Sequence, residues 1–365
     1  MKYKLPKLVE RMDTNPKRQR GWVPNLPRWR FGLACLLLAL SAWPLAGSAQ
    51  QRQKRSDYAT KRVAAVPENK ELEKAVLSKG RGGEGGEPLP PPLTPEERDG
   101  NKLVALSAKD AFRQKAIQAK VRQRVFAFGQ EVVGSGEYFQ FGSGQPKLLR
   151  LDMKMQVGPQ AASLLQICGR QDYWIRRHVP PAAPKLEHVN LTRLASALSR
   201  EGDDGKYLTT DHWILLGGLS RLLESLHRNF DFAPTRQARI DKEFVLVVQG
   251  RLKPERFKAL HPSGDKKSDA ATEQIPTAVI LTLRRADQPL PHFPHRIEFL
   301  RQLTPKEFKS TAGQAAQPAT ETVLSILEFV DPQAHVELDP QLFEFDPGDE
   351  ESEDKTQTWL RKLQE

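Results

Sequence analysis

Two places in the sequence carry residue types that could do chemistry: the histidines His292 and His295, and the cysteine Cys168. A metal site needs three or four convergent ligands, and no acid or cysteine lies at a familiar spacing from the two histidines. We therefore interpret His292 and His295 as solvent-exposed loop residues. A reactive thiol needs a nearby base and neighbours that stabilise the thiolate, and Arg170 alone is too little. We expect an inert thiol.

The glycine-rich and acidic stretches also lack the context of a known site. Gly134-Ser135-Gly136 and Gly142-Ser143-Gly144 are predicted to be hairpin turns, because no helix follows whose N-terminus could hold a phosphate. The chain has no P-loop, no GxSxG elbow and no HExxH motif. The acidic run 346–354 lacks the interleaved spacing of a calcium loop and is expected to be solvated. The sequence thus predicts no enzyme, no cofactor and no metal.

The elements around these residues are predicted from periodicity. Apolar and polar residues alternate from Lys147 to Val157, and a period of two is typical of a strand with one face on a core. Turn-prone residues divide the surrounding 125–179 segment into an antiparallel meander. Its strands are expected at 124–133, 137–142, 147–157, 163–168 and 173–178, with a sixth at 186–191.

Apolar residues at helical spacing predict helices at 103–120, 191–200 and 211–228. The third has the broadest apolar stripe: Leu215, Leu216, Leu219, Leu222, Leu223, Leu226 and Phe230. Gly217-Gly218 weakens this helix by about 1 kcal/mol per glycine, and we interpret the pair as allowing close packing, with a bend as the alternative. Further strands are expected at 236–241, 244–252, 278–284, 295–302 and 322–330, and a short helix at 356–363.

The N-terminus has the pattern of a secretory signal. Nine Lys or Arg and two acids precede residue 31, an uncharged apolar run follows to residue 47, and Gly47-Ser48-Ala49 supplies small residues. Cleavage is expected between Ala49 and Gln50. Two alternatives are an uncleaved anchor in the inner membrane, for which the run is short, and a buried helix. Cleavage would leave Cys168 as the only cysteine, so that no intrachain disulfide could form.

Composition divides the rest of the chain. Residues 50–101 are charged and rich in Gly and Pro, and such a segment is predicted to be a disordered tether. Residues 102–346 are expected to form one β-rich domain, and 347–365 an acidic tail with a short helix. The net charge of +11 lies mainly in the signal and in 52–62, whereas a nucleic-acid site needs basic charge on a folded surface. We predict no nucleic-acid partner.

The segment from about 103 to 179 resembles the LolA/LolB family of periplasmic lipoprotein carriers. The matching stretches are Gly136 with the 137–141 strand, Gln145-Pro146 with the strand after it, Cys168-Gly169, and Tyr173-Trp174. Two residues depart from the family pattern, since Gln145 stands in place of an Arg and Cys168 in place of an Asp. In the family that Arg helps to latch a lid over the ligand cavity.

The resemblance implies an α+β fold: a curved, half-open antiparallel β-barrel with helices on its concave side. It also implies an apolar cavity for acyl chains on that side. The predicted lining residues are Leu149, Leu151, Met153, Met155, Trp174, Leu216, Leu219 and Leu223. The alternative is that these side chains simply pack together as a core.

Three functions follow from these observations. The first is an exported, non-catalytic envelope protein of a bacterium, in the periplasm, that binds a lipid, an acyl chain or a lipoprotein. The second is an envelope scaffold with a filled core and a protein partner. The third is a hydrolase with an unrecognised site. In each, the chain touches a membrane only through an uncleaved signal segment.

Overall fold

The computed structural model describes residues 92–127, 130–142, 146–157, 160–201, 213–240, 243–260, 275–302 and 321–364. The predicted signal with its Ala49–Gln50 cleavage site, and the tether up to residue 91, lie outside these residues. So does Gln145. Among the described residues, no helix has the length and apolar character needed to cross a membrane.

Thirteen strands of the described residues form one sheet, which is antiparallel apart from the pair β13 and β6. The first six strands form five pairs of consecutive strands, as predicted for the meander. They are β1 (Ala116–Ala127), β2 (Gln130–Phe141), β3 (Leu148–Val157), β4 (Gln160–Cys168), β5 (Asp172–His178) and β6 (Lys185–Asn190).

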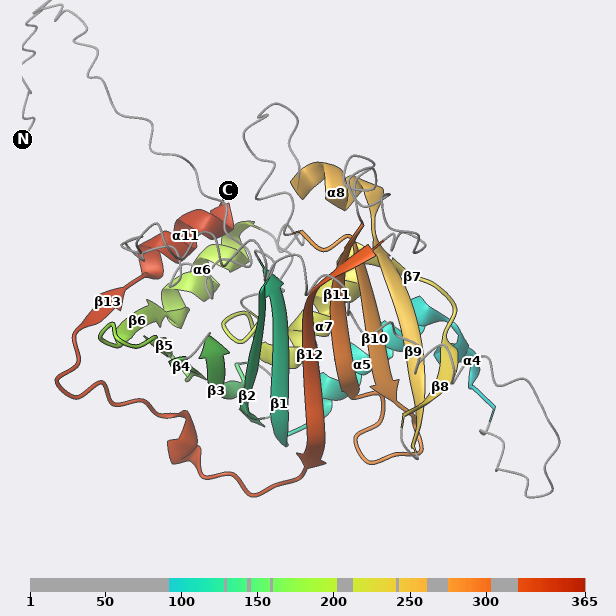
Figure 1. Ribbon diagram of the computed structural model, residues 1–365, viewed down its shortest axis with the longest axis horizontal. Helices are drawn as coiled ribbons and strands as arrows, with labels where there is room; N and C mark the ends of the chain where they lie inside the picture. The colour runs from blue at the N-terminus through green and yellow to red at the C-terminus, as the bar shows by residue number, and fades with distance from the viewer. Residues whose placement is uncertain are drawn as a thin grey trace, which may run out of the picture. The chain divides into compact units, whose positions relative to one another are not determined.

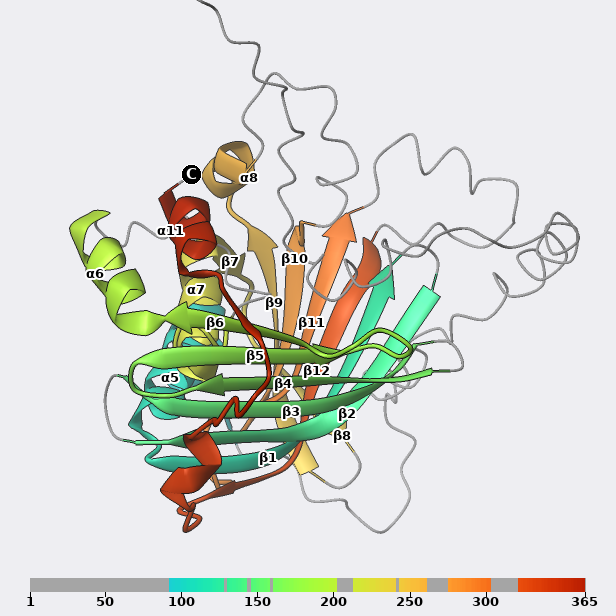
Figure 2. The ribbon, with the colours of Figure 1, turned by 90° about the vertical axis from the view of Figure 1, so that its left-hand side faces the viewer.

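The later strands extend the sheet on the other side of β1. They are β7 (Phe230–Phe232), β8 (Arg236–Ile240), β9 (Glu243–Leu252), β10 (Ala278–Arg284), β11 (Pro294–Gln302), β12 (Glu321–Ala334) and β13 (Ser352–Asp354). The strand order is β13-β6-β5-β4-β3-β2-β1-β12-β11-β10-β9-β7, and β8 also pairs with β9. The two ends of this order do not pair, so the sheet curves without closing (Figure 1, Figure 2). The expected half-open, LolA-like α+β fold is confirmed.

Two helices lie on the concave side of the sheet, α5 (Gly100–Arg113) and α7 (Gly218–Asn229), and they pack on each other (Figure 1). Asp99 caps α5 by accepting hydrogen bonds from the amides of Asn101 and Lys102. The remaining helices of the described part are α4 (Pro95–Arg98), α6 (Leu191–Glu201), α8 (Pro254–Leu260), the 3-10 helix η1 (Pro340–Phe343) and α11 (Thr356–Gln364).

The boundaries predicted around β1 and β2 were wrong. The helix expected at 103–120 ends at Arg113, and β1 begins at Ala116, because residues 116–125 alternate buried and more exposed positions and pair with both β2 and β12. The hairpin expected at Gly134-Ser135-Gly136 is the middle of β2. Instead, β1 ends at Ala127 and β2 begins at Gln130.

The end of the chain crosses the outer face of the first six strands (Figure 2). Arg150 donates a hydrogen bond to the carbonyl oxygen of Leu342 at 3.0 Å. Arg176 donates two to the carboxylate of Glu350, at 2.9 and 2.7 Å. β13 then pairs with β6, and α11 buries Trp359. Part of the acidic run 346–354 is therefore bound to the sheet.

Candidate functional site

The apolar side chains of β3 lie on the concave face, as the alternation predicts. Leu149, Leu151, Met153 and Met155 are at most 8% exposed and belong to the main hydrophobic core. One of their contacts with the helix layer is between Leu149 and Gly218. A Cβ atom placed on Gly218 would come within 2.9 Å of both Cδ atoms of Leu149. Gly218 therefore permits the close packing that we predicted for the glycine pair.

Helix α7 covers this face but begins later than predicted. Gly217 and Gly218 have φ angles of 115° and 79°, which non-glycine residues rarely adopt, so the pair starts the helix and does not interrupt it. Leu219 and Leu223 are fully buried against the sheet, in agreement with the predicted stripe. Leu216 lies in the turn before the helix and is only partly buried.

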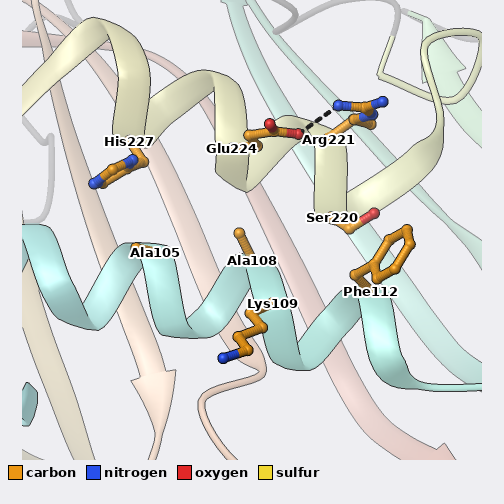
Figure 3. A pocket seen from close by; sticks show the side chains of 8 residues that line it. All are labelled: Ala105, Ala108, Lys109, Phe112, Ser220, Arg221, Glu224 and His227. Carbon is orange, nitrogen blue, oxygen red and sulfur yellow. Dashed lines mark hydrogen bonds and ion pairs between the residues drawn. The ribbon is translucent and has the colours of Figure 1, made fainter.

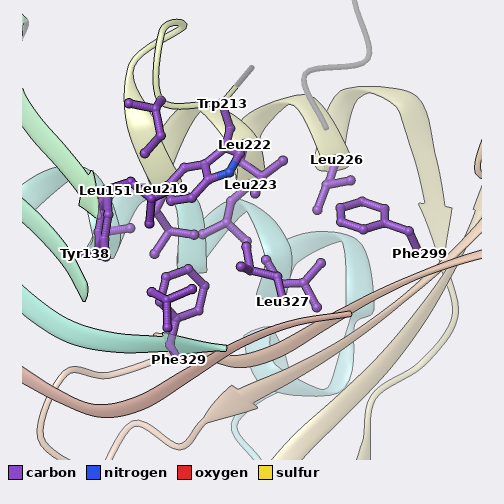
Figure 4. Close-up of a cluster of buried hydrophobic side chains, with 14 of the residues drawn as sticks. Tyr138, Leu151, Trp213, Leu219, Leu222, Leu223, Leu226, Phe299, Leu327 and Phe329 are labelled. Atoms are coloured by element: carbon purple, nitrogen blue, oxygen red, sulfur yellow. The ribbon is translucent and has the colours of Figure 1, made fainter. Parts of the chain in front are cut away.

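Trp213, in that same turn, is the residue of the site that the sequence reasoning missed. Its ring lies 5.2 Å from the ring of Tyr138 and 6.3 Å from the ring of Phe329, between centroids, and the side chain is 6% exposed (Figure 4). Ile214 and Leu215 next to it are also buried. The apolar run immediately before the glycine pair was the available signal. These three side chains fill the concave face beside α7.

Trp174 does not join the other predicted lining residues. Its neighbours Tyr173 and Ile175 are the ones that point into the core, and side chains alternate faces along a strand. The Trp174 ring instead lies 4.5 Å from the ring of His188 and 5.3 Å from that of Phe345, between centroids. Trp174 thus contacts the C-terminal segment on the outer face.

Of the residues considered for chemistry, Cys168 and His292 are buried, and His295 is partly buried and lies in β11 instead of a loop. Burial raises the pKa of the Cys168 thiol to about 12, so it carries little thiolate at neutral pH. The prediction that His292 is solvent-exposed was wrong. It is 5% exposed, and its Nδ1 atom lies 2.9 Å from a carboxylate oxygen of Asp110. Within the part of the chain that the structure describes, no group of three or more His, Cys, Asp or Glu could hold a metal ion.

Lys147 is a buried base that is held by backbone carbonyl groups. Its ammonium group donates hydrogen bonds to the carbonyl oxygens of Ala111, at 3.3 Å, and Gln114, at 2.8 Å, where α5 ends. Carbonyl groups at the end of a helix have no partner within it and attract cations. Lys147 therefore ties the start of β3 to the end of α5, at the edge of the concave face.

The pH dependence of stability should report this burial. Burial lowers the pKa of Lys147 to about 8, from an ordinary value of 10.5. Above pH 10.5 Lys147 is uncharged in both the folded and the unfolded state, so that no charge is buried. As the pH falls from 10.5 to about 8, the unfolded state takes up a proton that the folded state does not, so the folded state loses stability. Relative to Lys147→Met, the wild type should gain about 3 kcal/mol of unfolding free energy as the pH rises across that window. Urea unfolding of both proteins measures the difference, and a constant difference would show that the pKa of Lys147 is not lowered by burial.

Comparisons with known proteins give structural neighbours only. No protein-family model matches the sequence, and no curated protein matches it. A putative outer membrane lipoprotein-sorting protein domain from Vibrio parahaemolyticus is 11% identical over 67% of this chain and 95% of its own, with a TM-score of 0.27. LprF from Mycobacterium bovis is 12% identical over 68% and 98%, with a TM-score of 0.30. A DUF1329 family protein from Desulfovibrio piger is 9% identical over 66% and 94%, with a TM-score of 0.28.

The similarity of this chain to these three structures is low in both sequence and geometry. With identities and TM-scores this low, they say nothing about what the chain binds or does.

Proposed function

We propose that this protein is an exported, non-catalytic envelope protein that binds a lipid, or an acyl chain of a lipoprotein, on the concave face of its half-open sheet. The observation that carries the proposal is how the apolar side chains on that face are covered. Leu149, Leu151, Met153 and Met155 form one apolar strip. Part of its cover is the buried apolar segment 213–215, which Leu216 and Gly217 connect to Gly218, the first residue of α7.

The chain's own side chains fill the site, so a ligand would take the place of the Trp213 ring. Because Gly217 and Gly218 both have positive φ angles, the segment before them can change direction without breaking α7. Methionine side chains are flexible and adapt to ligands of irregular shape, which suits Met153 and Met155 to an acyl chain. We place the site in the periplasm, on the strength of the predicted signal.

A specific observation also favours the second candidate, a scaffold with no ligand. The predicted lining residues of β3 and α7 are buried, apart from Leu216, by the protein itself. A core of this kind is complete without an acyl chain. In that function, an envelope protein partner would bind elsewhere on the surface, and the concave face would only stabilise the fold.

Removal of the Trp213 ring separates the two functions. If the ring occupies the ligand site, Trp213→Ala should bind palmitate at least about tenfold more tightly than the wild type, because the wild type must first displace the ring. Native mass spectrometry and titration with palmitate measure this. Organic extraction of the wild-type protein purified from the envelope should also release lipid.

Trp359→Ala is the matched control, because Trp359 is equally buried, at 5% exposure, but lies on α11. Palmitate binding that is tighter than the wild type's in both variants would indicate general loosening of the core. If neither the wild type nor Trp213→Ala binds palmitate, and no lipid is extracted, the scaffold function holds and the carrier function is wrong.

A further inference from the structure

A second apolar site lies on the opposite side of the helix pair, facing away from the sheet. It is a groove of about 430 Å³ between α5 and α7. The two helices run in opposite directions along it, so that Phe112 of α5 lies near Ser220 of α7, and Ala105 lies towards His227 (Figure 3). The concave-face side chains discussed above do not line it.

The floor of the groove is small and mostly apolar. Ala105 and Ala108 contribute only methyl groups, so the helix backbones are open to close approach. At one end stands Phe112, whose side chain is 40% exposed, one of the few large apolar side chains of the described part with such exposure. An aromatic ring left half in water beside an apolar floor offers a surface for another apolar group.

The hydroxyl group of Ser220 needs a hydrogen-bond partner that a ligand in the groove could provide. Ser220 is 4% exposed, and its Oγ atom has no hydrogen-bond partner in the structure. Buried hydroxyl groups are nearly always hydrogen-bonded, and an exception needs an explanation. The side chain lies at the groove beside Phe112 (Figure 3). A ligand with an acceptor atom at this end of the groove would supply the missing bond.

The charges at the rim favour an anion. Lys109 lines the groove and has no ion pair or hydrogen bond to any described residue. Arg221 forms an ion pair with Glu224 at 2.7 Å. Of the charged side chains that line the groove, Lys109 and Arg221 are cations and Glu224 is the carboxylate, so the rim has a net positive charge.

We propose that the α5–α7 groove binds an anionic single-chain amphiphile, such as a fatty acid or a monoalkyl phosphate. The chain lies on the alanine floor against Phe112, and the headgroup meets Ser220 Oγ, where the net positive charge of the rim attracts it. This site is separate from the concave face and does not depend on the proposed function there.

The size of the groove decides between an amphiphile and a partner helix. From Ala105 to Phe112 the groove runs along about 10 Å of helix. A specific protein interface needs roughly 1,000 Å² of buried surface, which two helical turns do not provide. The volume of about 430 Å³ lies within the range of about 300–1,000 Å³ that is typical of small-molecule sites.

Titration of the full chain with three twelve-carbon probes tests the proposal. Dodecanoate carries the carboxylate headgroup of a fatty acid, and dodecyl phosphate carries that of a monoalkyl phosphate. Dodecylamine carries the opposite charge, and all three are used below their micellar concentrations. Dodecanoate or dodecyl phosphate should bind at least about tenfold more tightly than the amine. Shortening the bound chain by two methylene groups should raise the Kd by up to about tenfold.

Variants locate the binding. Lys109→Glu should raise the Kd of the anionic probe by about tenfold, whereas Lys102→Glu, the same change on the exposed N-terminal turn of α5, should leave it unchanged. Ala108→Phe fills the floor and should abolish binding. Ser220→Ala removes only the hydroxyl group and should weaken binding several-fold without loss of stability.

The proposal is overturned if neither anionic probe binds, if the amine binds as tightly, or if Lys109→Glu and Lys102→Glu behave alike. Trp213→Ala distinguishes this site from the concave face. It should leave the Lys109-dependent binding of dodecanoate unchanged, while Ala108→Phe should leave unchanged the additional palmitate binding that Trp213→Ala gains over the wild type. Tighter dodecanoate binding in Trp213→Ala that neither Ala108→Phe nor Lys109→Glu reduces would place the probe on the concave face and reject the groove.

Discussion

Gly136→Ala should lower the unfolding free energy by about 3 kcal/mol, near the upper end of what overpacking costs. Gly136 lies in the middle of β2 and pairs with Met153 of β3. A Cβ atom at Gly136 would lie 1.8 Å from the backbone carbonyl oxygen of Asp152. Because that oxygen belongs to the neighbouring strand, the overlap can be relieved only if β2 and β3 separate. Urea unfolding followed by circular dichroism measures the loss.

Gly134→Ala is the matched control, two residues away on the same strand. A Cβ atom there would meet Met155 Cγ at 2.8 Å and Met153 Cε at 3.0 Å, which are atoms of flexible side chains. These side chains can shift, so the loss should be about 1 kcal/mol. Equal losses for the two variants would show that backbone overlap does not govern the effect.

The same glycines show where sequence reasoning stopped. Gly134-Ser135-Gly136 was interpreted as a turn because glycine and serine favour turns. Glycine inside a strand also marks a place where another backbone approaches closely, and that backbone is β3, which follows later in the chain. Local composition is the same in the two cases. Only the strand pairing distinguishes them.

Several strands were predicted almost to the residue, since β3, β10 and β5 match their expected ranges within one residue at each end. In β3 the period of two shows which face of the strand is buried, whereas β10 is a short apolar run that is buried on both faces. Helix ends were less accurate. In 114–120 helical and strand spacing overlap, and the choice of strand depends on hydrogen bonds to β2 and β12.

The sequence predicted the candidate site only where its residues follow the period of a strand or a helix. The buried face of β3 and the stripe of α7 follow from periodicity. Trp213 has no such periodicity, because its place between Tyr138 and Phe329 joins segments from distant parts of the sequence. The burial of His292 likewise depends on Asp110, which lies 182 positions earlier in the chain. No spacing rule connects such pairs.

His292→Leu should lower the unfolding free energy by about 3–5 kcal/mol. The carboxylates of Asp110 and Glu97 would stay buried without the imidazole ring that contacts them. The His292 Nδ1 atom lies 2.9 Å from Asp110 Oδ2, and Nε2 lies 3.5 Å from Glu97 Oε1. Glu97 is 2% exposed. Ser107 donates a 2.7 Å hydrogen bond to the carbonyl oxygen of His292. The ring thus fastens α4 and α5 to the loop between β10 and β11.

His335→Leu is the matched control for backbone effects. His335 has a φ angle of 57°, close to the 54° of His292, but its side chain is exposed. A leucine is equally strained at both positions, so any loss above that of His335→Leu reports the buried contacts. We expect His335→Leu to change the stability by less than about 0.5 kcal/mol. Equal losses at the two positions would contradict a role for the carboxylates.

Acid pH should reduce the difference between His292→Leu and the wild type. Burial by itself raises the pKa of Glu97, but hydrogen bonds from Thr94 and Ala286 and the attraction of His292 outweigh it and leave the pKa below 4.5. A carboxyl group with a lowered pKa stabilises the fold above its unfolded pKa, and this contribution is lost as the pH falls through the folded pKa. Unfolding curves between about pH 7 and pH 3 should therefore converge. If the gap stayed constant across this range, the loss would come from packing of the ring and not from its charge.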